Sequence, residues 1–417
     1  MKVDVIIFIE HVPRELYISE LIKNKLQQRG LKVVIASMSY HKHKVLLNYK
    51  TKSIITPFIG FGKNSICDIY YKIYGDDILY FNLNYEQFLF PFTGKFKLPK
   101  TKTAKQNQIN FCWGDHFKKY LNEGGVIKKN LVVSGRPYSE AILMQKDKSY
   151  QIKKDICLKY NLEIKKKIVF VALTDSLAFY SEEKIKKIVA FGGSLEGLLI
   201  QKDHDQKTIN KLIQVFKHLE KDPRFLQYQF IFKPHPTVSI KMYKQLFKQN
   251  NFSLPENILL VQGEDPIKIL LSSDYLLTNY STLIVDALTI DKTVLCFNHD
   301  KTLDYLWWAE FSDEFINTPD ELISSLEKTF NKNKNISEYY IQSSMGITNI
   351  SNEISKRIKT KKNELFDKFV VWRIFKFSNL ILKSFIKSIL FVTAKKLNHS
   401  FAKDEDHFNL AEVNKTI

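Results

Sequence analysis

The sequence predicts an α/β fold built from two Rossmann-like domains, for three reasons. An apolar run, a segment of helical spacing and a second apolar run follow one another within residues 3–36. A second series of this kind begins at residues 168–173. The length of 417 residues gives each of two domains enough chain for its own core, and 44% hydrophobic residues exclude a disordered chain.

The first series opens with residues 3–9, which are apolar except for Asp4, as in a central strand of a parallel sheet. The apolar residues that follow have helical spacing as far as Arg29-Gly30, and residues 31–36 are expected to form the next strand. The loop after the first strand lacks the GxGxxG pattern, which argues against a classical dinucleotide site.

Charged side chains occupy that first loop instead and are candidates for a site. Charged groups at the carboxyl end of a parallel strand point into the crevice of the sheet, although a pair on an exposed loop is the alternative. The loop residues are Glu10, His11, Arg14 and Glu15. Further candidates follow later strands: Glu86 beside Gln87, unless this is a plain loop, and then Asp115, His116 and Arg136.

The second series carries a rigid turn at the end of its second strand. Residues 230–232 are apolar and stop at Lys233-Pro234-His235-Pro236. Because two prolines fix φ on both sides of His235, a helix cannot form there. His235 should therefore lie on a turn just beyond a strand, where open α/β sheets bind ligands.

Residues with hydroxyl or amide side chains follow another predicted strand of the second series, at residues 275–277. They are Thr278, Asn279, Tyr280, Ser281 and Thr282, and residues 283–289 should form a helix after them. Such residues either cap the helix or bind an anion at its start, and with His235 they indicate a diphosphate site. Thr174 and Ser176, after the strand at 168–173, allow the same two interpretations. Glu264 either favours the start of a helix at Pro266 or faces a nucleotide ribose.

Together these motifs resemble the donor domain of bacterial GT-B transferases that make surface polymers. In those families Lys/Arg-x-His-Pro is followed by Ser-Asp-x-x-x-Thr-Asp/Asn-Tyr-Ser-Ser/Thr, which here is residues 273–282 with Asn279 in place of the commoner Asp. CDP-glycerol glycerophosphotransferases and capsule β-Kdo transferases share both motifs. The first loop is similar to a bacterial surface carbohydrate biosynthesis family whose first strand ends in Glu-x-x-x-Arg-Glu-Leu, matched by Glu10, Arg14, Glu15 and Leu16.

The resemblance implies a GT-B-like fold, with two Rossmann-like domains facing a cleft and a C-terminal helical tail. The expected divisions are an acceptor domain at residues 1–149, a nucleotide-donor domain at 150–340, and a crossover with the tail at 341–417. The implied reaction moves a sugar or polyol phosphate from a cytidine-nucleotide-activated donor to a lipid-linked or polymeric surface glycan. No other cofactor is expected.

Individual roles are implied in the same way. His235 and Lys233, on the turn that Pro236 closes, would stabilise the departing phosphate. Thr174, Thr278, Asn279, Ser281 and Thr282 would bind the donor, and Glu264 would face its ribose. Glu10 would act as general base and Arg14 would orient it, with Glu86 as second choice for the base. The alternatives are a nucleotide-sugar epimerase of the same architecture and a non-catalytic membrane-associated assembly protein.

The composition of the chain limits the kinds of binding partner that we expect. The net charge of +19 comes mostly from lysine, and an anionic membrane surface or phosphorylated substrates suit it better than nucleic acid does. Four scattered cysteines indicate buried thiols. The formal DxD at residues 203–205 lies in a polar stretch before a predicted helix at 209–219, so no metal is expected. Without a signal peptide or an apolar run of 18 residues, we expect a cytoplasmic protein.

Residues 365–397 differ from the rest of the chain because they are both apolar and basic, without Gly or Pro. At the angular spacing of a helix, one narrow face carries Arg373, Lys376, Lys383 and Lys387. The opposite face carries Phe375, Leu382, Phe385, Ile386 and Ile389. This pattern is typical of an interfacial anchor on the inner face of the cell membrane, and the alternative is a helix packed on the protein.

Overall fold

The computed structural model confirms the α/β fold and divides the chain into two compact units. Unit 1 contains Met1–Gln87, Lys97–Ala141 and Ser337–Ile417, and unit 2 contains Phe88–Phe96 and Ile142–Ile336. The structure describes residues 1–59, 65–90, 97–190, 193–298, 306–331, 336, 339–341, 345–361, 382–383, 385–390 and 413–414. The side chains of Pro13 and Arg14 lie outside this description, as do Phe375, Arg373 and Lys376 of the tail.

Unit 1 is organised around one parallel sheet. Its strands are β1 (Lys2–Ile9), β2 (Val33–Ser37), β3 (Lys50–Thr56), β4 (Leu79–Asn82), β5 (Gln108–Cys112) and β6 (Leu131–Val133). All neighbours pair in parallel in the order β2-β1-β3-β4-β5-β6, so the direction of winding reverses between β1 and β3. The loops after these two strands lie at the topological switch point, which is where open α/β sheets form their crevice.

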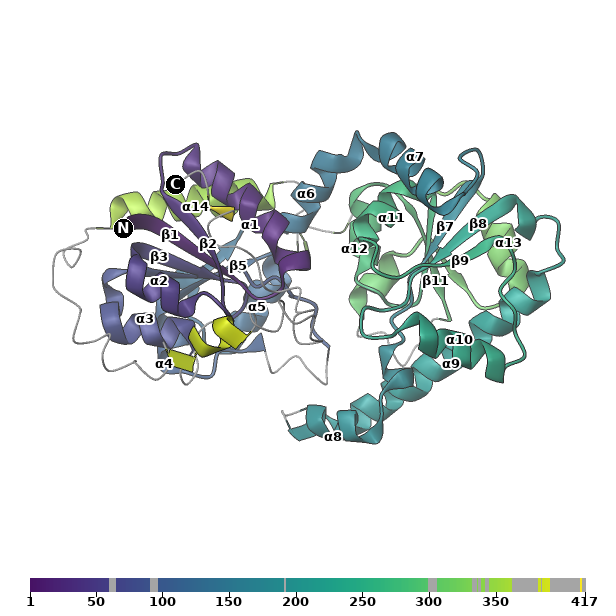
Figure 1. Cartoon of the computed structure of the whole chain (residues 1–417), viewed down its shortest axis with the longest axis horizontal. Coiled ribbons are helices and arrows are strands. Elements are labelled where there is room, and N and C mark those ends of the chain that lie inside the picture. Colours follow the sequence, from purple (N-terminus) through teal and green to yellow (C-terminus); the bar gives the residue numbers. More distant parts are fainter. Residues whose placement is uncertain are drawn as a thin grey trace. The chain divides into compact units, whose positions relative to one another are not determined.

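Helices cover both faces of this sheet (Figure 1). They are α1 (Val12–Gln27), α2 (Lys42–Asn48), α3 (Ile66–Tyr74), α4 (Lys102–Asn107), α5 (Asp115–Glu123) and α14 (Gly346–Thr360), with 3₁₀ turns η1 (Gly75–Asp77) and η3 (Lys128–Asn130). Alternate residues of β1 enter different cores: Ile7 packs with the α1 and α14 side, and Phe8 with the α2 and α3 side. Burial on both faces explains why the run at residues 3–9 is apolar throughout.

The late helix α14 packs closely on unit 1. Its first residue, Gly346, approaches the backbone of Arg136 so closely that a Cβ there would lie 2.5 Å from the Arg136 carbonyl carbon. A Cβ on Gly114 would likewise lie 2.5 Å from the Tyr340 carbonyl oxygen. Glycine at these two positions therefore allows the returning chain to pack against the ends of β5 and β6.

Unit 2 contains the second parallel sheet. Its strands are β7 (Lys167–Val171), β8 (Tyr228–Phe232), β9 (Ile258–Leu260), β10 (Tyr275–Thr278), β11 (Thr293–Phe297) and β12 (Glu314–Ile316). Their order is β12-β11-β10-β7-β8-β9, which, counted from β7, is the 3-2-1-4-5-6 order of the Rossmann fold. The switch point lies between β7 and β10, which pair directly from Tyr275 opposite Val169 to Leu277 opposite Val171.

Helices also flank both faces of the second sheet (Figure 1). They are α7 (Ser149–Tyr160), α8 (Glu182–Ala190), α9 (Leu195–Leu219), α10 (Ile240–Gln249), α11 (Pro266–Ser272), α12 (Leu283–Thr289) and α13 (Pro319–Glu327), with 3₁₀ turns η4 (Ser176–Phe179), η5 (Phe225–Gln227) and η7 (Trp307–Phe311). The division between the units falls within α6 (Pro137–Lys146). One face of the sheet buries a core shared with α9, α10 and α13, in which Phe216, Phe225 and Phe230 pack together.

One helix starts earlier than the sequence predicted. Residues 203–205 were placed before a helix at 209–219, but they lie inside α9, whose cap is Ser194. The hydroxyl of Ser194 accepts a hydrogen bond from the Gly197 N–H at 3.3 Å. Polar side chains on the buried face of α9 made this helix look like a loop in the sequence. All four cysteines are buried and unpaired, as predicted.

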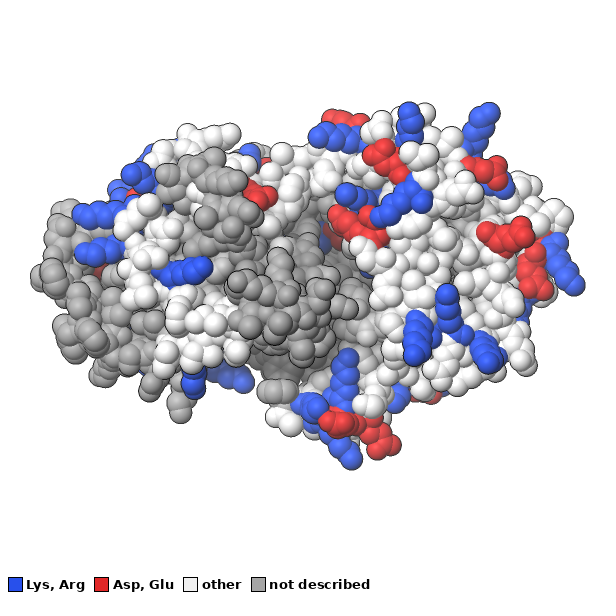
Figure 2. Space-filling view, viewed as in Figure 1, with Lys and Arg blue, Asp and Glu red and all other residues white. Residues whose placement is uncertain are grey.

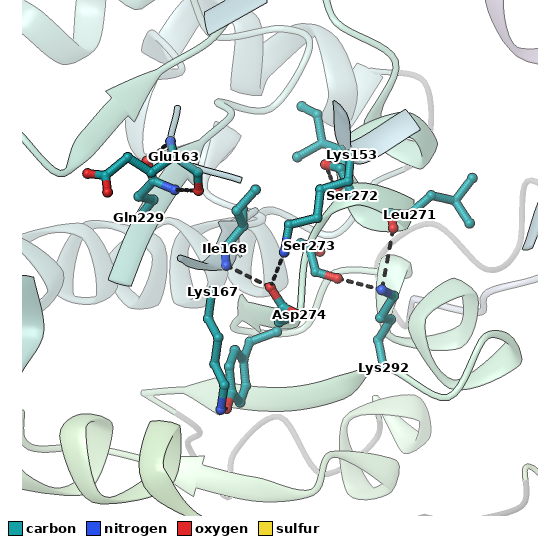
Figure 3. Close-up of polar contacts among 12 residues, drawn as sticks. Lys153, Glu163, Lys167, Ile168, Gln229, Leu271, Ser272, Ser273, Asp274 and Lys292 are labelled. Atoms are coloured by element: carbon teal, nitrogen blue, oxygen red, sulfur yellow. Dashed lines mark hydrogen bonds and ion pairs between the residues drawn. The ribbon is translucent and has the colours of Figure 1, made fainter. Parts of the chain in front are cut away.

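Polar contacts fasten unit 2 at the amino end of β10 (Figure 3). Oδ2 of Asp274 accepts hydrogen bonds from the Ile168 N–H of β7 at 2.8 Å and from Lys153 Nζ of α7 at 3.1 Å. The Lys292 ammonium binds the carbonyl oxygens of Leu271 and Ser273. The Ser-Asp half of the motif at 273–282 therefore connects α7, β7 and β10, at the opposite end of the strand from Asn279.

No described helix is long and apolar enough to cross a bilayer.

The close contact of Gly346 yields the first prediction. Gly346→Ala should lower the free energy of unfolding by about 1–3 kcal/mol, because the added methyl group overlaps backbone atoms of Arg136 that cannot rotate away. Chemical denaturation followed by circular dichroism measures this loss. Lys356→Ala, at an exposed position of the same helix, is the control and should change stability by less than about 0.5 kcal/mol. Equal stability of the two variants would contradict the close contact.

Candidate functional site

The candidate site of unit 2 lies where three neighbouring strands end. The turn with His235 follows β8, the segment with Thr174 follows β7, and the segment at 278–282 ends β10 and continues beyond it. Because β8, β7 and β10 are adjacent in the sheet, their carboxyl ends bring these three loops together. This is the switch point of a Rossmann-type sheet, so the structure assembles the motif residues at the position expected for a ligand.

His235 is held in one orientation by its own turn. Its Nδ1 accepts a hydrogen bond from the Thr237 N–H at 3.3 Å and lies 2.9 Å from the Thr237 hydroxyl. The Val238 N–H donates to the His235 carbonyl oxygen at 2.8 Å, which closes the turn. Since Nδ1 is an acceptor, the proton of a neutral imidazole is on Nε2, and His235 can donate from that atom.

Burial and positive charge keep His235 neutral. Its pKa falls to about 4, first because the ring is buried and then because the ammonium groups of Lys233 and Lys184 are near. Burial also lowers the pKa of Lys233, and the carboxylate of Asp265 opposes this effect. Two cations and a neutral N–H donor therefore share one end of the sheet, an arrangement that favours an anion such as phosphate.

Hydroxyl groups complete this cluster. The Tyr180 hydroxyl lies 3.5 Å from the Thr237 hydroxyl, and Lys184 Nζ lies 3.5 Å from the centre of the Tyr180 ring. Burial acts to raise the pKa of the Tyr180 phenol, but hydrogen bonds with Thr237 and Ser176 and the ammonium of Lys184 outweigh it, so that pKa is lowered. We call Ser176, Tyr180, Lys184, Lys233, His235 and Thr237 the donor-rich cluster. Tyr180 and Lys184 were missed in the sequence, because nothing in it places the start of α8 beside the turn after β8.

Asn279 and Thr278 join the loops instead of facing an open site. The Asn279 amide accepts from the Thr174 N–H at 2.8 Å and donates to the Thr174 carbonyl oxygen at 2.9 Å. The Thr278 hydroxyl donates to the Ala172 carbonyl oxygen. Both side chains are buried. An uncharged amide satisfies one backbone donor and one backbone acceptor, which a carboxylate cannot do, and this explains an Asn at this position.

Ser281 and Thr282 differ in what their hydroxyl groups do. The Ser281 hydroxyl accepts from the N–H of Leu283, the first residue of α12, at 3.3 Å. Thr282 makes no side-chain cap and is half-buried. The Tyr280 ring is buried, and the Tyr280 carbonyl oxygen accepts a hydrogen bond from the Trp308 indole at 2.7 Å.

A pair of buried carboxyl groups lies behind the switch point. Asp205 of α9 accepts hydrogen bonds from the Tyr280 hydroxyl, from the Gln201 amide at 3.0 Å and from the Leu177 N–H at 3.1 Å. Burial raises the pKa of Asp205 to about 7, although these hydrogen bonds oppose the shift. Asp175 is fully buried, and neither of its carboxyl oxygens has a hydrogen-bond partner among the residues that the structure describes. Burial and then the neighbouring Asp205 raise its pKa well above the ordinary value.

Glu264 binds elsewhere than the donor-rich cluster. Its Oε2 accepts hydrogen bonds from Lys159 Nζ at 2.5 Å and from the Tyr160 hydroxyl at 3.0 Å, both on α7. Burial acts to raise its pKa, but these hydrogen bonds outweigh burial and lower it. Asp265 caps α11 by accepting from the Ile267 N–H at 2.9 Å. The carboxylate of Glu264 is thus already engaged in fastening α7 to the loop after β9.

The residues of the DxD pattern do not converge on one point. Asp203 forms an exposed ion pair with Lys207 at 2.6 Å, and Nε2 of His204 lies 3.1 Å from the Asn298 carbonyl oxygen. Among the described residues, no group of three or more His, Cys, Asp or Glu side chains is placed to hold a metal ion. On the face shown in Figure 2, charges of both signs are interspersed over unit 2. The excess of cations in the donor-rich cluster is therefore local.

In unit 1, Glu10 follows β1 at the switch point of the first sheet. Its carboxylate is 40% exposed and lies 3.5 Å from His11 Nε2. The neighbouring Glu15 has a different task, because it is buried and accepts hydrogen bonds from the N–H groups of Glu10 and His11 at 2.7 and 3.3 Å. Glu15 thereby fixes the loop that presents Glu10. The predicted partner, Arg14, falls among the side chains that the structure does not describe.

Glu86 follows β4, which is separated from β1 in the sheet by β3. Its side chain is 47% exposed, and Lys97 lies 3.9 Å from it. The adjacent Gln87 is buried and donates to the carbonyl oxygens of Asn84 and Phe111 at 3.1 and 3.0 Å. In the Glu-Gln pair, the Gln87 amide therefore has a structural role, whereas the Glu86 carboxylate is exposed.

The three residues expected near a cleft after β5 and β6 make contacts within unit 1. Asp115 is exposed and pairs with Lys118. The His116 ring lies against Tyr339 and Tyr340. Arg136 is buried, with its guanidinium 5.1 Å from the centre of the Trp113 ring. Two of the three are thus covered, because the returning chain packs where the sequence suggested open space.

Comparisons with known proteins bear on the fold. No protein-family model matches the chain, and no curated protein sequence matches it. A variant of the wall teichoic acid polymerase TagF soaked with CDPG aligns with a TM-score of 0.50 at 14% identity, covering 85% of this chain and 88% of that one. The UDP-GlcNAc 2-epimerase of Methanocaldococcus jannaschii aligns with a TM-score of 0.55 at 12% identity, covering 85% and 100%. That of Neisseria meningitidis, bound to UDP-GlcNAc, gives 0.53 at 13% identity, covering 86% and 100%. The chain has the two-domain GT-B-like fold of these proteins.

The buried carboxyl pair predicts how stability depends on pH. Folded Asp205 keeps its proton up to about pH 7, whereas the unfolded chain releases it near the ordinary value of about 3.9. The folded state therefore binds more protons in this window, and the free energy of unfolding should fall as the pH rises through it. Asp205→Asn should reduce this slope, as measured by denaturant unfolding between about pH 4.5 and 7.5. Asp203→Asn, at an exposed position of the same helix, should leave the slope unchanged, and an unchanged slope in both variants would contradict the assignment.

Proposed function

We propose that the protein is a transferase that moves a sugar or a polyol phosphate from a cytidine-nucleotide-activated donor to a bacterial surface glycan. The observation that carries this proposal is the donor-rich cluster at the switch point of unit 2. It combines the ammonium groups of Lys233 and Lys184 with the Nε2–H of a neutral His235. Such groups bind a diphosphate and stabilise the negative charge that develops on it when it leaves.

The roles proposed for the cluster and for the motif residues around it follow from their charge and position. Lys233 and Lys184 compensate the charge of the departing phosphate, and His235 donates a hydrogen bond to it from Nε2. Ser176 and Thr282 bring hydroxyl groups from the loops after β7 and β10. Thr174, Thr278 and Asn279 act indirectly, since their hydrogen bonds set the spacing of these loops. Pro236 shapes the turn, and Glu264 acts only through the position of α7.

For the acceptor, we propose Glu10 as general base. It would take the proton of the acceptor hydroxyl while that oxygen forms the new bond and the nucleotide phosphate leaves with the bonding electrons. Its exposure and the rigid loop behind it support this role. Glu86, also exposed, is the second candidate. The chemistry proposed for these residues needs no metal.

The choice of cytidine comes from the motif resemblance, and one cheap experiment tests it. Ligands that bind the native state raise Tm, so CMP, CDP, UDP and GDP can be compared by thermal shift. An epimerase is the second candidate function, because solved UDP-GlcNAc 2-epimerases share the fold. Stabilisation by UDP together with conversion of UDP-GlcNAc in the absence of any acceptor would favour the epimerase.

The cluster gives a prediction for His235. Removing its Nε2 donor in His235→Ala should lower the transfer rate by at least about 10²-fold, the loss typical of one donor to a developing anion. The thermal stability of the apoprotein should change little, since among the described residues the ring bonds to Thr237 of its own turn. His218→Ala, at an exposed position of α9, serves as the control. A folded His235→Ala protein with normal transfer would refute the assignment.

A separate prediction concerns Glu10. Glu10→Gln keeps the size of the side chain but removes the base, and turnover should fall by about 10²-fold or more. Stabilisation by the nucleotide should persist, because the nucleotide is assigned to unit 2. Glu123→Gln, exposed on α5, controls for the loss of one negative charge. If Glu10→Gln turns over at the wild-type rate, the base is Glu86 or another group.

A further inference from the structure

One described part of the C-terminal tail, residues 382–383 and 385–390, is helical and lies on unit 1. We call it the tail segment. The Ser388 hydroxyl donates to the Tyr40 carbonyl oxygen at 2.6 Å, and Lys387 Nζ lies 4.5 Å from the centre of the Tyr40 ring. The Phe385 ring packs edge-on against His43 at 5.6 Å. The tail segment is therefore attached to the loop and helix that follow β2.

Attachment leaves most of its apolar side chains in solvent. The exposed fractions are 53% for Leu382, 48% for Phe385, 45% for Ile386, 47% for Ile389 and 56% for Leu390. Five large apolar side chains exposed within nine residues form a contiguous patch, and such patches on soluble domains mark interaction surfaces. The polar residues Lys387 and Ser388 face unit 1, which is the reverse of the arrangement in a helix that packs to hide its apolar face.

We propose that the tail segment is a membrane-contact surface of unit 1 and that its partner is an anionic lipid bilayer. Charge selects this partner over another protein surface. Residues 368–403 contain eight Lys or Arg and no Asp or Glu, and the whole chain carries a net charge of +19. Apolar side chains flanked by lysines enter the interface of a bilayer while the ammonium groups reach the anionic headgroups. A second copy of this chain would bring the same positive charge and be repelled.

The tail segment lies at the same edge of the first sheet as Glu10. Tyr40 belongs to the loop after β2, whose Met38 N–H donates to the Ile9 carbonyl oxygen at 2.8 Å, one residue before Glu10. Burial lowers the pKa of Lys42, the first residue of α2; the nearby Lys387 ammonium lowers it further, and the nearby Glu10 carboxylate opposes the shift. The patch and Glu10 thus lie at the carboxyl ends of β1 and β2. Combined with the proposed function, and resting on it, this placement implies an acceptor that is itself linked to lipid.

Point substitutions test the surface better than deletion of the tail. Residues 413–414 dock on unit 1, where the Asn414 amide makes two hydrogen bonds of 2.9 Å with the backbone of Ile35 and the Val413 carbonyl oxygen accepts from Lys23. A truncation before residue 382 would remove these contacts too and could unfold unit 1. Substitutions within the exposed patch leave them in place.

The experiment is flotation of the full-length protein with vesicles of phosphatidylcholine, with and without phosphatidylglycerol. The wild type should float with the anionic vesicles, and Phe385→Ser/Ile386→Ser/Ile389→Ser should reduce the bound fraction by at least about tenfold. The matched control is Leu195→Ser/Leu199→Ser/Ile200→Ser, which changes three side chains of α9 that are each 50% exposed on unit 2, and it should float like the wild type.

Three flotation results would overturn membrane contact by the tail segment. They are a wild type that does not float with anionic vesicles, a tail variant that floats equally well, and equal losses in the tail variant and the α9 control. Equal binding to neutral vesicles would overturn the choice of anionic lipid. A wild type that is dimeric by sedimentation and a monomeric tail variant would assign the patch to self-association. Flotation needs neither donor nor acceptor, so its failure is distinct from failure of the proposed transfer reaction.

Discussion

The geometry of the candidate site depends on the two hydrogen bonds between the Asn279 amide and the backbone of Thr174. At the switch point the chain leaves β7 and β10 in opposite directions around the sheet, so the ladder of hydrogen bonds ends there and buried backbone groups lose their partners. A buried backbone group without a partner costs about 1–3 kcal/mol. One amide supplies both the missing acceptor and the missing donor. It also fixes the distance between two of the loops that form the site.

Next to Thr174, unit 2 contains a buried pair of carboxyl groups, which is unfavourable for folding. Two carboxyl groups, Asp175 and Asp205, are buried near each other, and Asp175 has no hydrogen-bond partner among the described residues. Burial, and then the neighbouring Asp205, raise the pKa of Asp175 well above its ordinary value, because the charged form is poorly solvated. Asp175 therefore stays protonated and adds no negative charge at the edge of the sheet that carries the cations of the donor-rich cluster. Asp205, whose pKa burial raises to about 7, releases its proton only as the pH rises through that value.

The sequence was most informative where local chemistry alone determines structure. The apolar runs predicted β1, β7, β8 and β10, and the prolines predicted both the turn at His235 and the start of α11. Prediction failed where tertiary contacts decide. The buried polar face of α9 looks like a loop in the sequence, Gly346 packs on the backbone of Arg136, and Tyr339 and Tyr340 lie against the His116 ring. The donor-rich cluster was half visible, since Lys233 and His235 belong to a motif. Tyr180 and Lys184 join it through tertiary contacts, since the Tyr180 hydroxyl lies 3.5 Å from the Thr237 hydroxyl and Lys184 Nζ lies 3.5 Å from the centre of the Tyr180 ring.

Most motif residues hold the structure together, and few of them are placed to contact a ligand. Within residues 273–282, Asp274 fastens the amino end of β10, Thr278 and Asn279 join the loops at its carboxyl end, and Tyr280 anchors Asp205. At the carboxyl end of the motif, Ser281 and Thr282 are partly exposed, and the Ser281 hydroxyl already accepts a hydrogen bond from the Leu283 N–H. In this chain most residues of the motif therefore shape the crevice. The cations that would bind a diphosphate come from the turn after β8 and from α8, so the specificity of the site is determined by the loops that the motif holds in place.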